Sequence, residues 1–354
     1  IKSAWNDGTD WTSVTQQVDS GNADELQILC RYRQRTEQVG HTVWFTDVAL
    51  EEIGESPDAA KARAKIKEAK KKQRVPGLAA ALGERELIVS QEGRDMYVTP
   101  GGAGAEDGSD WENAMSAVGG GLQSAWNAAG PGSTVYVGSG DYANITLRIA
   151  AGGASHYRPI TLQGVDTGEG LPQFKGTWHR TDPSKGRIFV HIAEDVGYVR
   201  IADIRVARCK RVVDLEGRNL GIRITNVDVT HTRDAFVLTG GATPEAPHLG
   251  TEDVIIRDCQ VVFYTKRAVR IRGGVSGVRV IGCDADAGGA DYYAESFPMG
   301  YHVRGSELPG VYDHDIVFID CTSRNNYQER GNKYWNADGF AAEFHGAVVG
   351  PVHA

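Results

Sequence analysis

One recurring pattern in the second half of the chain limits the folds that it can adopt. A short run of alternating apolar residues is followed by Asp, Asn or Gly and then by another apolar residue. The copies begin at residues 199, 222, 254, 278 and 316, so their spacings are 23, 32, 24 and 38 residues. A period near 23 residues with insertions is typical of the coils of a parallel β-helix, whereas a β-propeller blade needs about 40–45 residues. We therefore predict an all-β fold, a right-handed parallel β-helix.

A second apolar strand follows each of these runs, and its copies can be aligned with one another. Because side chains alternate across a strand, the alignment predicts two inward ladders. Such ladders bury a continuous core, since each coil covers its neighbour. The first ladder contains Val213, Phe236, Val269, Tyr301 and Phe340, and the second contains Leu215, Leu238, Ile271, Val303 and Ala342.

The five cysteines fit this scaffold better than a zinc site or a disulfide framework, because they are widely spaced and form no CxxC motif. Cys259, Cys283 and Cys321 fall at the inward position that Ile204 and Val227 occupy in earlier coils. We expect reduced thiols that pack as small apolar side chains. The polar residue before this position is expected to serve turn formation rather than catalysis. Its copies are Asp203, Asn226, Asp258 and Asp320.

The composition divides the chain into three parts. Residues 1–53 contain alternating strands that resemble the last strands of a jelly-roll carbohydrate-binding module, which predicts a partial β-sandwich; a small strand pair on the main domain is the alternative. Residues 54–93 are rich in Ala, Lys and Arg and predict a basic helical linker. Residues 94–354 are assigned to the β-helix. At its entry Asp110 is expected to cap a helix that plugs the open core. The apolar residues of this helix are Trp111, Ala114, Val118, Leu122, Ala125 and Ala129.

Charge and hydropathy exclude several functions. A net charge of −8 argues against nucleic-acid binding, and no apolar stretch approaches the ~18 residues of a membrane span. The sequence begins at Ile1 without Met, so we expect that a leader was removed or that the chain is a piece of a longer protein. The last coil would expose its core, so a partner chain or further coils after Ala354 are expected to cover it.

The connection between the two strands of a coil is long in the last two copies, and both insertions leave the same edge of the solenoid. They are rich in aromatic, amide and carboxylate side chains. Aromatic faces stack on sugar rings and polar groups bind hydroxyls, which predicts a glycan groove; the alternative is that these loops only cover the surface. The candidate sugar contacts are Tyr292, Tyr293, Tyr327, Tyr334, Trp335 and Asn336.

Basic residues occupy outward positions of the second strands. Arg270 and His302 are expected in one row, and Arg272, Arg304 and Glu343 in the next. An exposed arginine row beside a carboxylate suits a uronate polymer, while a surface salt-bridge ladder of little consequence is the alternative. We take Arg272, Arg304, His302 and Glu343 as candidate catalytic residues and Arg270 as a candidate substrate contact.

The stretch Lys333-Tyr-Trp-Asn-Ala-Asp-Gly-Phe-Ala-Ala-Glu343 resembles a segment of family 9 pectate lyases. The resemblance implies a β-helix lyase in which Asp338 is a calcium ligand. It also implies that further aspartate ligands and a lysine base would follow Ala354. Calcium takes six to eight oxygen ligands, so we hypothesise that Asp284 and Asp286 help Asp338 to bind it.

These observations lead to one main interpretation and two alternatives. The main interpretation is a secreted or cell-surface, calcium-dependent lyase that cleaves an acidic polysaccharide by β-elimination, with the cation neutralising the uronate carboxylate. A β-helix glycoside hydrolase with paired carboxylates is one alternative, weakened because Ala341 or Ala342 stands where a second aspartate is needed. A glycan-binding or adhesive solenoid without catalysis is the other.

Overall fold

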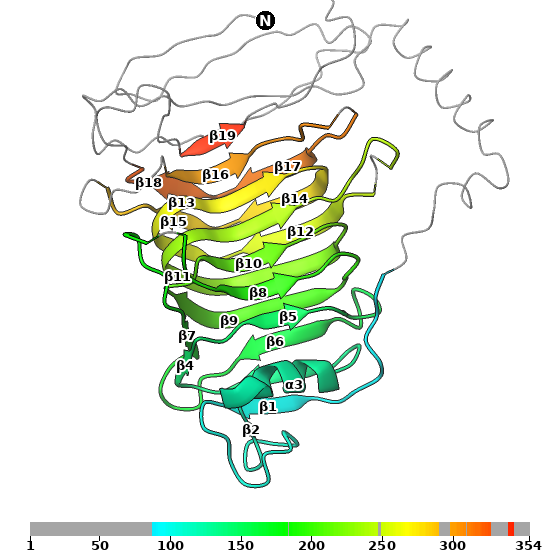
Figure 1. The fold of residues 1–354 in the computed structure, drawn as a ribbon, viewed down its shortest axis with the longest axis vertical. Helices are drawn as coiled ribbons and strands as arrows, with labels where there is room; N and C mark the ends of the chain where they lie inside the picture. Colours follow the sequence, from blue (N-terminus) through cyan, green and yellow to red (C-terminus); the bar gives the residue numbers. More distant parts are fainter. Residues whose placement is uncertain are drawn as a thin grey trace, which may run out of the picture. The chain divides into compact units, whose positions relative to one another are not determined.

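The computed structural model describes residues 87–182, 184–246, 249–289, 298–308, 310–326 and 339–342. The predicted β-sandwich segment and nearly all of the basic linker lie outside the described residues. The described part is a parallel β-helix, as predicted, with strands stacked along one axis (Figure 1). No helix within these ranges is long and apolar enough to cross a membrane.

The coils form three parallel sheets, which we call the first, middle and last sheets. The first sheet contains β1 (Met96–Thr99), β3 (Thr134–Val137), β6 (Ile160–Gly164), β9 (Val199–Ala207), β11 (Leu220–Thr239), β12 (Thr251–Arg257), β14 (Val275–Ile281) and β17 (His314–Ile319). The middle sheet contains β4 (Asp141–Ala143), β7 (Gln173–Lys175), parts of β9, β11 and β13 (Gln260–Arg272), β15 (Asp284–Asp286) and β18 (Thr322–Arg324). The last sheet contains β5 (Leu147–Ile149), β8 (Ile188–Ile192), β10 (Arg211–Leu215), the ends of β11 and β13, β16 (Met299–Val303) and β19 (Phe340–Ala342).

The registers confirm the repeat that the sequence predicts. In the first sheet Ile222 pairs with Val254, Val254 with Val278, and Val278 with Ile316. In the last sheet both inward ladders continue from β10 to β19 in the predicted pairing. The rings of Tyr301 and Phe340 stack at 4.7 Å. Like side chains therefore fill the interior coil after coil, which removes apolar surface from water along the whole axis.

The middle sheet is a feature that the two-strand repeat does not predict. Its strands begin directly after the polar residue that ends the first-sheet strand. That residue has a left-handed backbone, with φ between 50° and 56° at its copies Asp203, Asn226, Asp258 and Asp320. Asp and Asn tolerate this conformation through local hydrogen bonds. The expected turn role is confirmed, and the turn directs the chain from the first sheet into the middle sheet.

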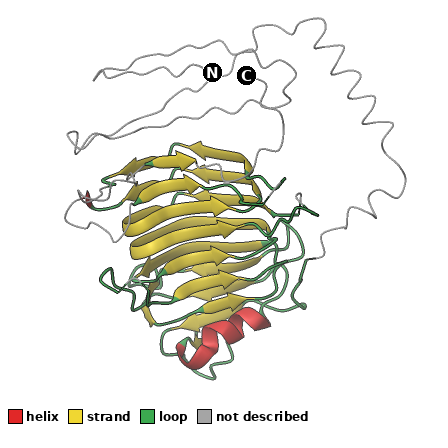
Figure 2. Cartoon of the chain, turned by 45° about the horizontal axis from the view of Figure 1, so that its top comes forward, coloured by secondary structure: helices red, strands yellow, loops and turns green. Residues whose placement is uncertain are grey.

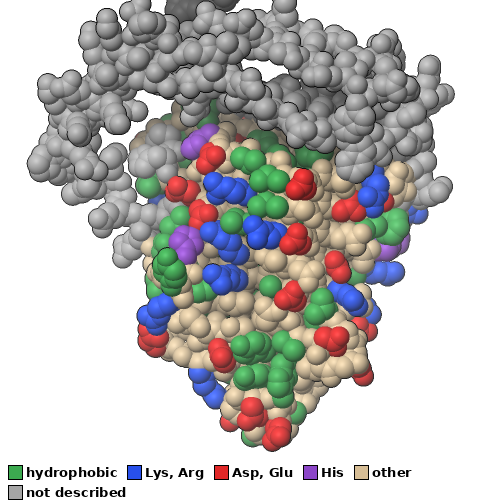
Figure 3. Space-filling view, turned by 180° about the vertical axis from the view of Figure 1, so that it is seen from behind, with side chains coloured by type: hydrophobic (Ala, Val, Ile, Leu, Met, Phe, Trp, Pro, Cys, Tyr) green, Lys and Arg blue, Asp and Glu red, His purple; other side chains and the backbone are tan. Residues whose placement is uncertain are grey.

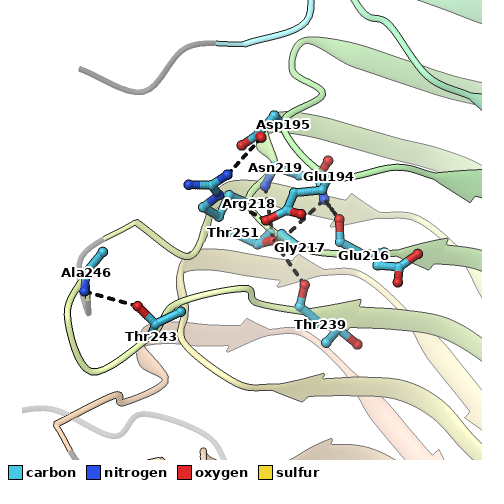
Figure 4. Close-up of polar contacts among 10 residues, drawn as sticks. All are labelled: Glu194, Asp195, Glu216, Gly217, Arg218, Asn219, Thr239, Thr243, Ala246 and Thr251. Carbon is cyan, nitrogen blue, oxygen red and sulfur yellow. Dashed lines mark hydrogen bonds and ion pairs between the residues drawn. The ribbon is translucent and has the colours of Figure 1, made fainter. Parts of the chain in front are cut away.

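The return from the last sheet to the first is stabilised by a polar network at the start of β11 (Figure 4). The Asn219 amide donates to the carbonyl of Glu216 at 2.9 Å, and the Thr251 hydroxyl donates to the carbonyl of Gly217. Asn219 and Thr251 are fully buried, so each supplies a hydrogen bond where water cannot. Arg218 contacts carboxylates of the preceding coil, Glu194 at 3.0 Å and Asp195 at 2.9 Å.

A short helix lies at the end of the solenoid near β1 (Figures 1 and 2). Helix α3 (Gly121–Ala128) buries Leu122, Ala125 and Trp126 in the core, so the predicted plug is present. Its predicted start at Asp110 is wrong. The Asp110 carboxylate instead accepts from the backbone N–H of Asn113 at 2.8 Å, within a loop before the two-residue strand β2 (Met115–Ser116) and the 3₁₀ turn η1 (Val118–Gly120). Gly119 and Gly120 have φ of 69° and 96°, which ends any continuous helix there.

The predicted thiol ladder is confirmed for the described residues. Cys209, Cys259 and Cys283 are free and buried, and Cys321 is free and partly buried. Burial raises the pKa of Cys209 to about 12. The pKa of Cys283 is raised to about 12, first by its contact with Cys259. Because the thiolate is the reactive form, these residues should be chemically inert.

We expect iodoacetamide to leave Cys209, Cys259 and Cys283 unmodified in the native protein at neutral pH and to modify all three in guanidinium. Peptide mass mapping of a Cys30→Ala variant measures this. Rapid native modification of Cys283 would show that the ladder is open to solvent.

Candidate functional site

A group of charged residues lies together on the outer side of the last sheet, on the ends of β11 and β13 and on β16. We call it the basic cluster. Its members are Arg233, Asp234, Lys266, Arg267, Arg270, Arg272 and His302. Four of them are buried: Asp234 is 1%, His302 1%, Arg267 5% and Arg270 8% exposed. Charged side chains are almost never buried without a specific arrangement of partners.

An irregular backbone at the start of the last-sheet strands turns these side chains outward. In β10 the adjacent residues Val212 and Val213 are both fully buried, which breaks the alternation of a regular strand. Arg211 and Asp214 on either side of them then reach one another, at 2.6 Å. Asp234 and Arg267 follow Arg211 in register. The pairing of β11 with β13 shifts just before Asp234, as expected for a β-bulge.

Arg267 joins the two buried groups at the centre of the cluster. Its Nη1 lies 3.6 Å from an Asp234 oxygen, and its Nε donates to Nδ1 of His302 at 2.8 Å. Arg233 approaches the other Asp234 oxygen at 3.4 Å. The Nδ1 of His302 is the acceptor in this contact, since a guanidinium N–H can only donate. Asp234 thus faces two guanidinium groups, those of Arg233 and Arg267.

The remaining cations of the cluster are not neutralised by described carboxylates. The pKa of Arg270 is lowered to about 10, first by burial and then by the charges of Arg267, Arg272 and Arg304, while Asp234 acts in the opposite direction. The Nε of Arg270 is buried and has no hydrogen-bond partner within the described ranges. A buried guanidinium beside other cations gains free energy from any anion that reaches it.

Lys266 stands at the solvent side of the cluster and is partly buried. Its pKa is lowered to about 8, first by burial and then by the charges of Arg233 and Arg267, while Asp234 acts in the opposite direction. A lysine side chain with a pKa near 8 is present at pH 8 as a mixture of its ammonium and amine forms. Groups with this property are candidates for proton transfer.

Other charges on the described surface form exposed ion pairs instead. Figure 3 shows basic side chains on successive coils with acidic side chains beside them. Lys175 and Asp141 are an example, 2.8 Å apart with side chains 43% and 65% exposed. Pairs of this kind contribute about 0–1 kcal/mol. The basic cluster differs because four of its seven members are buried and its charges are predominantly positive.

The structure confirms the predicted register of one outward row but contradicts its predicted exposure. Arg270 and His302 pair in register, as predicted, but both are buried rather than exposed. The expectation of an exposed arginine row is therefore wrong for this row. Arg272 pairs in register with Thr239, and Arg304 follows β16 and contacts Glu307 at 3.0 Å. Glu343 lies outside the described residues.

Asp284 and Asp286, predicted to help bind calcium, are held by an arginine of the next coil. Arg324 donates to both oxygens of Asp284 and, through Nε, to Asp286, each at 2.8 Å. The other Asp286 oxygen accepts from the backbone N–H of Gly288 and from Asn325, each at 2.9 Å. A cation would have to displace these donors, so this pair does not fit calcium. No group of three or more His, Cys, Asp or Glu side chains that could hold a metal lies within the described ranges.

The remaining predicted residues lie outside the described ranges. They are Asp338, the predicted calcium ligand, and the predicted sugar contacts Tyr292, Tyr293, Tyr327, Tyr334, Trp335 and Asn336. Their assigned roles stay predictions.

The sequence prediction missed Arg233, Asp234, Lys266 and Arg267 as site residues. The alignment of Arg211, Asp234 and Arg267 at one position of the repeat carried a usable signal, because a core position would be apolar. No sequence pattern identifies Lys266 in this way, since its lowered pKa depends on charges on two different coils.

Comparison with known proteins gives similarity in fold. No family model matches the chain, and no curated protein matches it. The pectate lyase Pel9A is 17% identical with a TM-score of 0.48, over 72% of this chain and 58% of that one. A rhamnogalacturonan lyase is 10% identical (TM-score 0.38; 61% and 73% covered), and a lacto-N-biosidase from Eubacterium ramulus is 12% identical (TM-score 0.39; 75% and 57% covered). At these identities the likeness concerns the fold alone.

We expect Asp234→Ala to lower the free energy of unfolding by about 3–5 kcal/mol, because it removes a buried carboxylate that faces the guanidinium groups of Arg233 and Arg267. Asp228→Ala is the matched control, since Asp228 is half-exposed and 3.9 Å from Arg205, and it should cost less than about 1 kcal/mol. Urea unfolding measures both. Equal effects would contradict the central role of Asp234 in the cluster.

Proposed function

We propose that this protein is a polysaccharide lyase that cleaves a uronate-containing polymer by β-elimination at the basic cluster. The observation that carries the proposal is the combination of the buried Arg270, whose Nε has no described partner, and the partly buried Lys266 with its pKa near 8. The chain has a net charge of −8, so a concentration of cations on neighbouring strands is a local feature and not a consequence of composition.

β-Elimination makes two demands that this arrangement can meet. Removal of the C5 proton places negative charge on the adjacent carboxylate, which needs a cation or strong hydrogen-bond donors. Arg270 and Arg272 supply planar guanidinium groups suited to a carboxylate. The electrons of the C5–H bond form the C4–C5 double bond, and the glycosidic oxygen leaves from C4 with a proton taken from solvent or from a nearby acid.

Lys266 is the residue best suited to take the C5 proton. Its amine form is populated near pH 8, whereas Arg270, with a pKa near 10, keeps its charge there. One group can therefore act as base while the other still binds the carboxylate. Asp234 and Arg267 act through position, since the Asp234–Arg267–His302 contacts fix the strand ends that carry Lys266 and Arg270.

Cellular location and loop contacts complete the proposal. A polymeric substrate requires a protein that is secreted or displayed at the cell surface. The aromatic residues of the two insertions, such as Tyr292 and Trp335, are proposed to contact sugar rings. A hydrolase would need two carboxylates in separate environments, and in the described cluster Asp234 stands alone between two arginines.

Lys266→Met is expected to lower the rate of unsaturated-product formation by about 10²–10⁴-fold, the usual contribution of a general base. The wild-type rate should rise with pH through the pKa of Lys266, about 8, because the amine is the active form. Ultraviolet absorbance of the unsaturated uronate measures both, on a panel of polygalacturonate, alginate and a glucuronate polymer.

Two variants separate the base from general charge effects. Lys266→Arg keeps the cation but cannot release its proton, so it should be as inactive as Lys266→Met while still binding polymer. Lys175→Met removes an exposed lysine on β7, which is not part of the basic cluster, and should keep full activity. New reducing ends without unsaturated product would indicate a hydrolase, and binding without any product an adhesive protein. Either outcome would overturn the proposed lyase.

Calcium dependence is a separate proposal that rests on Asp338. A carboxylate-bound calcium ion would supply additional neutralisation of the substrate carboxylate. We expect a calcium titration by calorimetry to give heat that is lost in Asp338→Ala and kept in Asp284→Ala, since Asp284 is bound to Arg324. Absence of heat in the wild-type protein would contradict a calcium site.

A further inference from the structure

A second basic site lies at the corner where the middle sheet ends. Arg208, His231 and Phe263 follow one another on successive coils, because Thr230 pairs with both Ala207 and Val262. All three have a left-handed backbone, with φ of 55°, 54° and 58°. The corner between the first and middle sheets has the same geometry but uses Asp, Asn or Gly.

The corner at the end of the middle sheet uses Arg, His and Phe, whereas the corner before the middle sheet uses Asp, Asn or Gly. A left-handed backbone costs an ordinary L-residue about 1–2 kcal/mol, and Asp, Asn and Gly reduce that cost. Arg208 and Phe263 have no short polar side chain that would do so. Non-glycine residues held in such conformations concentrate at functional sites, where the direction of the side chain matters more than the local cost.

Arg208 and His231 border a pocket of about 200 Å³, which we call the corner pocket. It is lined by Trp178, His179, Arg180, Arg208 and His231. No acidic side chain is among these lining residues. The indole of Trp178 is 1% exposed, and its Nε1 has no hydrogen-bond partner among the described residues. A buried donor in a pocket lined by two arginines is expected to meet an acceptor supplied by a ligand.

The electrostatics of the pocket favour an anion. Burial lowers the pKa of His231, and the charges of Arg208, Arg180 and His179 lower it further. The imidazole lies 5.0 Å from the Phe263 ring, so an aromatic surface adjoins the cationic groups. Arg208 is exposed and has no carboxylate partner in the described structure. A guanidinium, an indole N–H and an aromatic surface together suit an acidic sugar.

We propose that the corner pocket binds an oxyanion substituent, a carboxylate or a sulfate, on a sugar unit of an acidic polysaccharide. The site is separate from the basic cluster, and only the assignment of its ligand to a substrate polymer rests on the proposed function. The corner pocket would then be a second contact with the polymer, and the sugar unit bound there must carry a negative charge.

A shallow hollow beside the pocket offers room for the rest of the sugar chain. It has a volume of about 280 Å³ and is lined by polar residues of the middle sheet that include Gln173, Arg205, Asp228 and Gln260. Thr230 also lines this hollow, and its hydroxyl lies 2.7 Å from Nδ1 of His231, which lines the corner pocket. Thr230 and His231 thus link the linings of the two hollows, and we expect a polymer in one to place a substituent in the other.

The test uses inorganic sulfate as the probe and the ring resonances of His231 as the readout. In the wild-type protein, sulfate should shift these resonances in a saturable way and raise the pKa of His231, because an anion stabilises its protonated form. Sodium chloride at equal ionic strength should not reproduce the shift. Arg208→Asn should weaken sulfate binding by about tenfold to a hundredfold, and asparagine tolerates the left-handed backbone, so the fold is kept.

Arg148→Ala is the matched control, since Arg148 is exposed on β5, and it should bind sulfate like the wild type. A trigalacturonate and a sulfated disaccharide, each titrated separately, show which substituent is preferred. Absence of a saturable shift at His231, or an equal shift in Arg208→Asn, would overturn the proposal. Lys266→Met should leave sulfate binding intact, so failure of the lyase function and failure of this site give different results.

Discussion

The register between successive coils is the constraint on which the rest of this structure depends. Every coil hydrogen-bonds to the one before it and the one after it, so a side chain keeps its position in the cross-section from coil to coil. Inside the solenoid this produces the ladders of Phe236, Val269 and Tyr301. Outside, it places residues that are about thirty positions apart in the sequence beside one another, and charges of one sign then accumulate on neighbouring strands.

The basic cluster shows how that accumulation becomes a chemical property. A regular strand would alternate its side chains, and Asp234 and Arg267 would point inward. Adjacent buried residues just after them, Ala235 with Phe236 and Ala268 with Val269, break that alternation, and Arg267 instead contacts Asp234 and His302. Water can relieve the resulting excess of positive charge only in part, because Arg267 and Arg270 are buried. It is relieved in part by Asp234 and in part by a lower proton affinity of Lys266 and Arg270. A substrate carboxylate would relieve it further, which links the packing of the scaffold to the proposed reaction.

The fold could be predicted from the sequence because periodicity is a global signal. A period near 23 residues located the first-sheet strands, and alternation identified which residues of β10, β11, β13 and β16 face the core. The middle sheet escaped prediction because its strands are as short as three residues, as in β15, and follow a turn residue without a break in composition. The long helix expected from Asp110 failed because Gly119 and Gly120 adopt positive φ. The site residues were harder to predict than the fold. The repeat register identified Arg270 and His302 as neighbours. Their burial and the lowered pKa of Lys266 depend on contacts between coils, which a local sequence pattern does not show.

The most direct measurement of the central claim is the titration of Lys266 itself, by NMR of selectively labelled lysine side chains with Lys266→Arg used for assignment. The account predicts a pKa near 8 in the free protein, and an increase when a uronate oligosaccharide binds, because its carboxylate offsets the surrounding arginines. A Lys266 that titrates near the ordinary lysine value of about 10.4, and that does not respond to the oligosaccharide, would contradict the account.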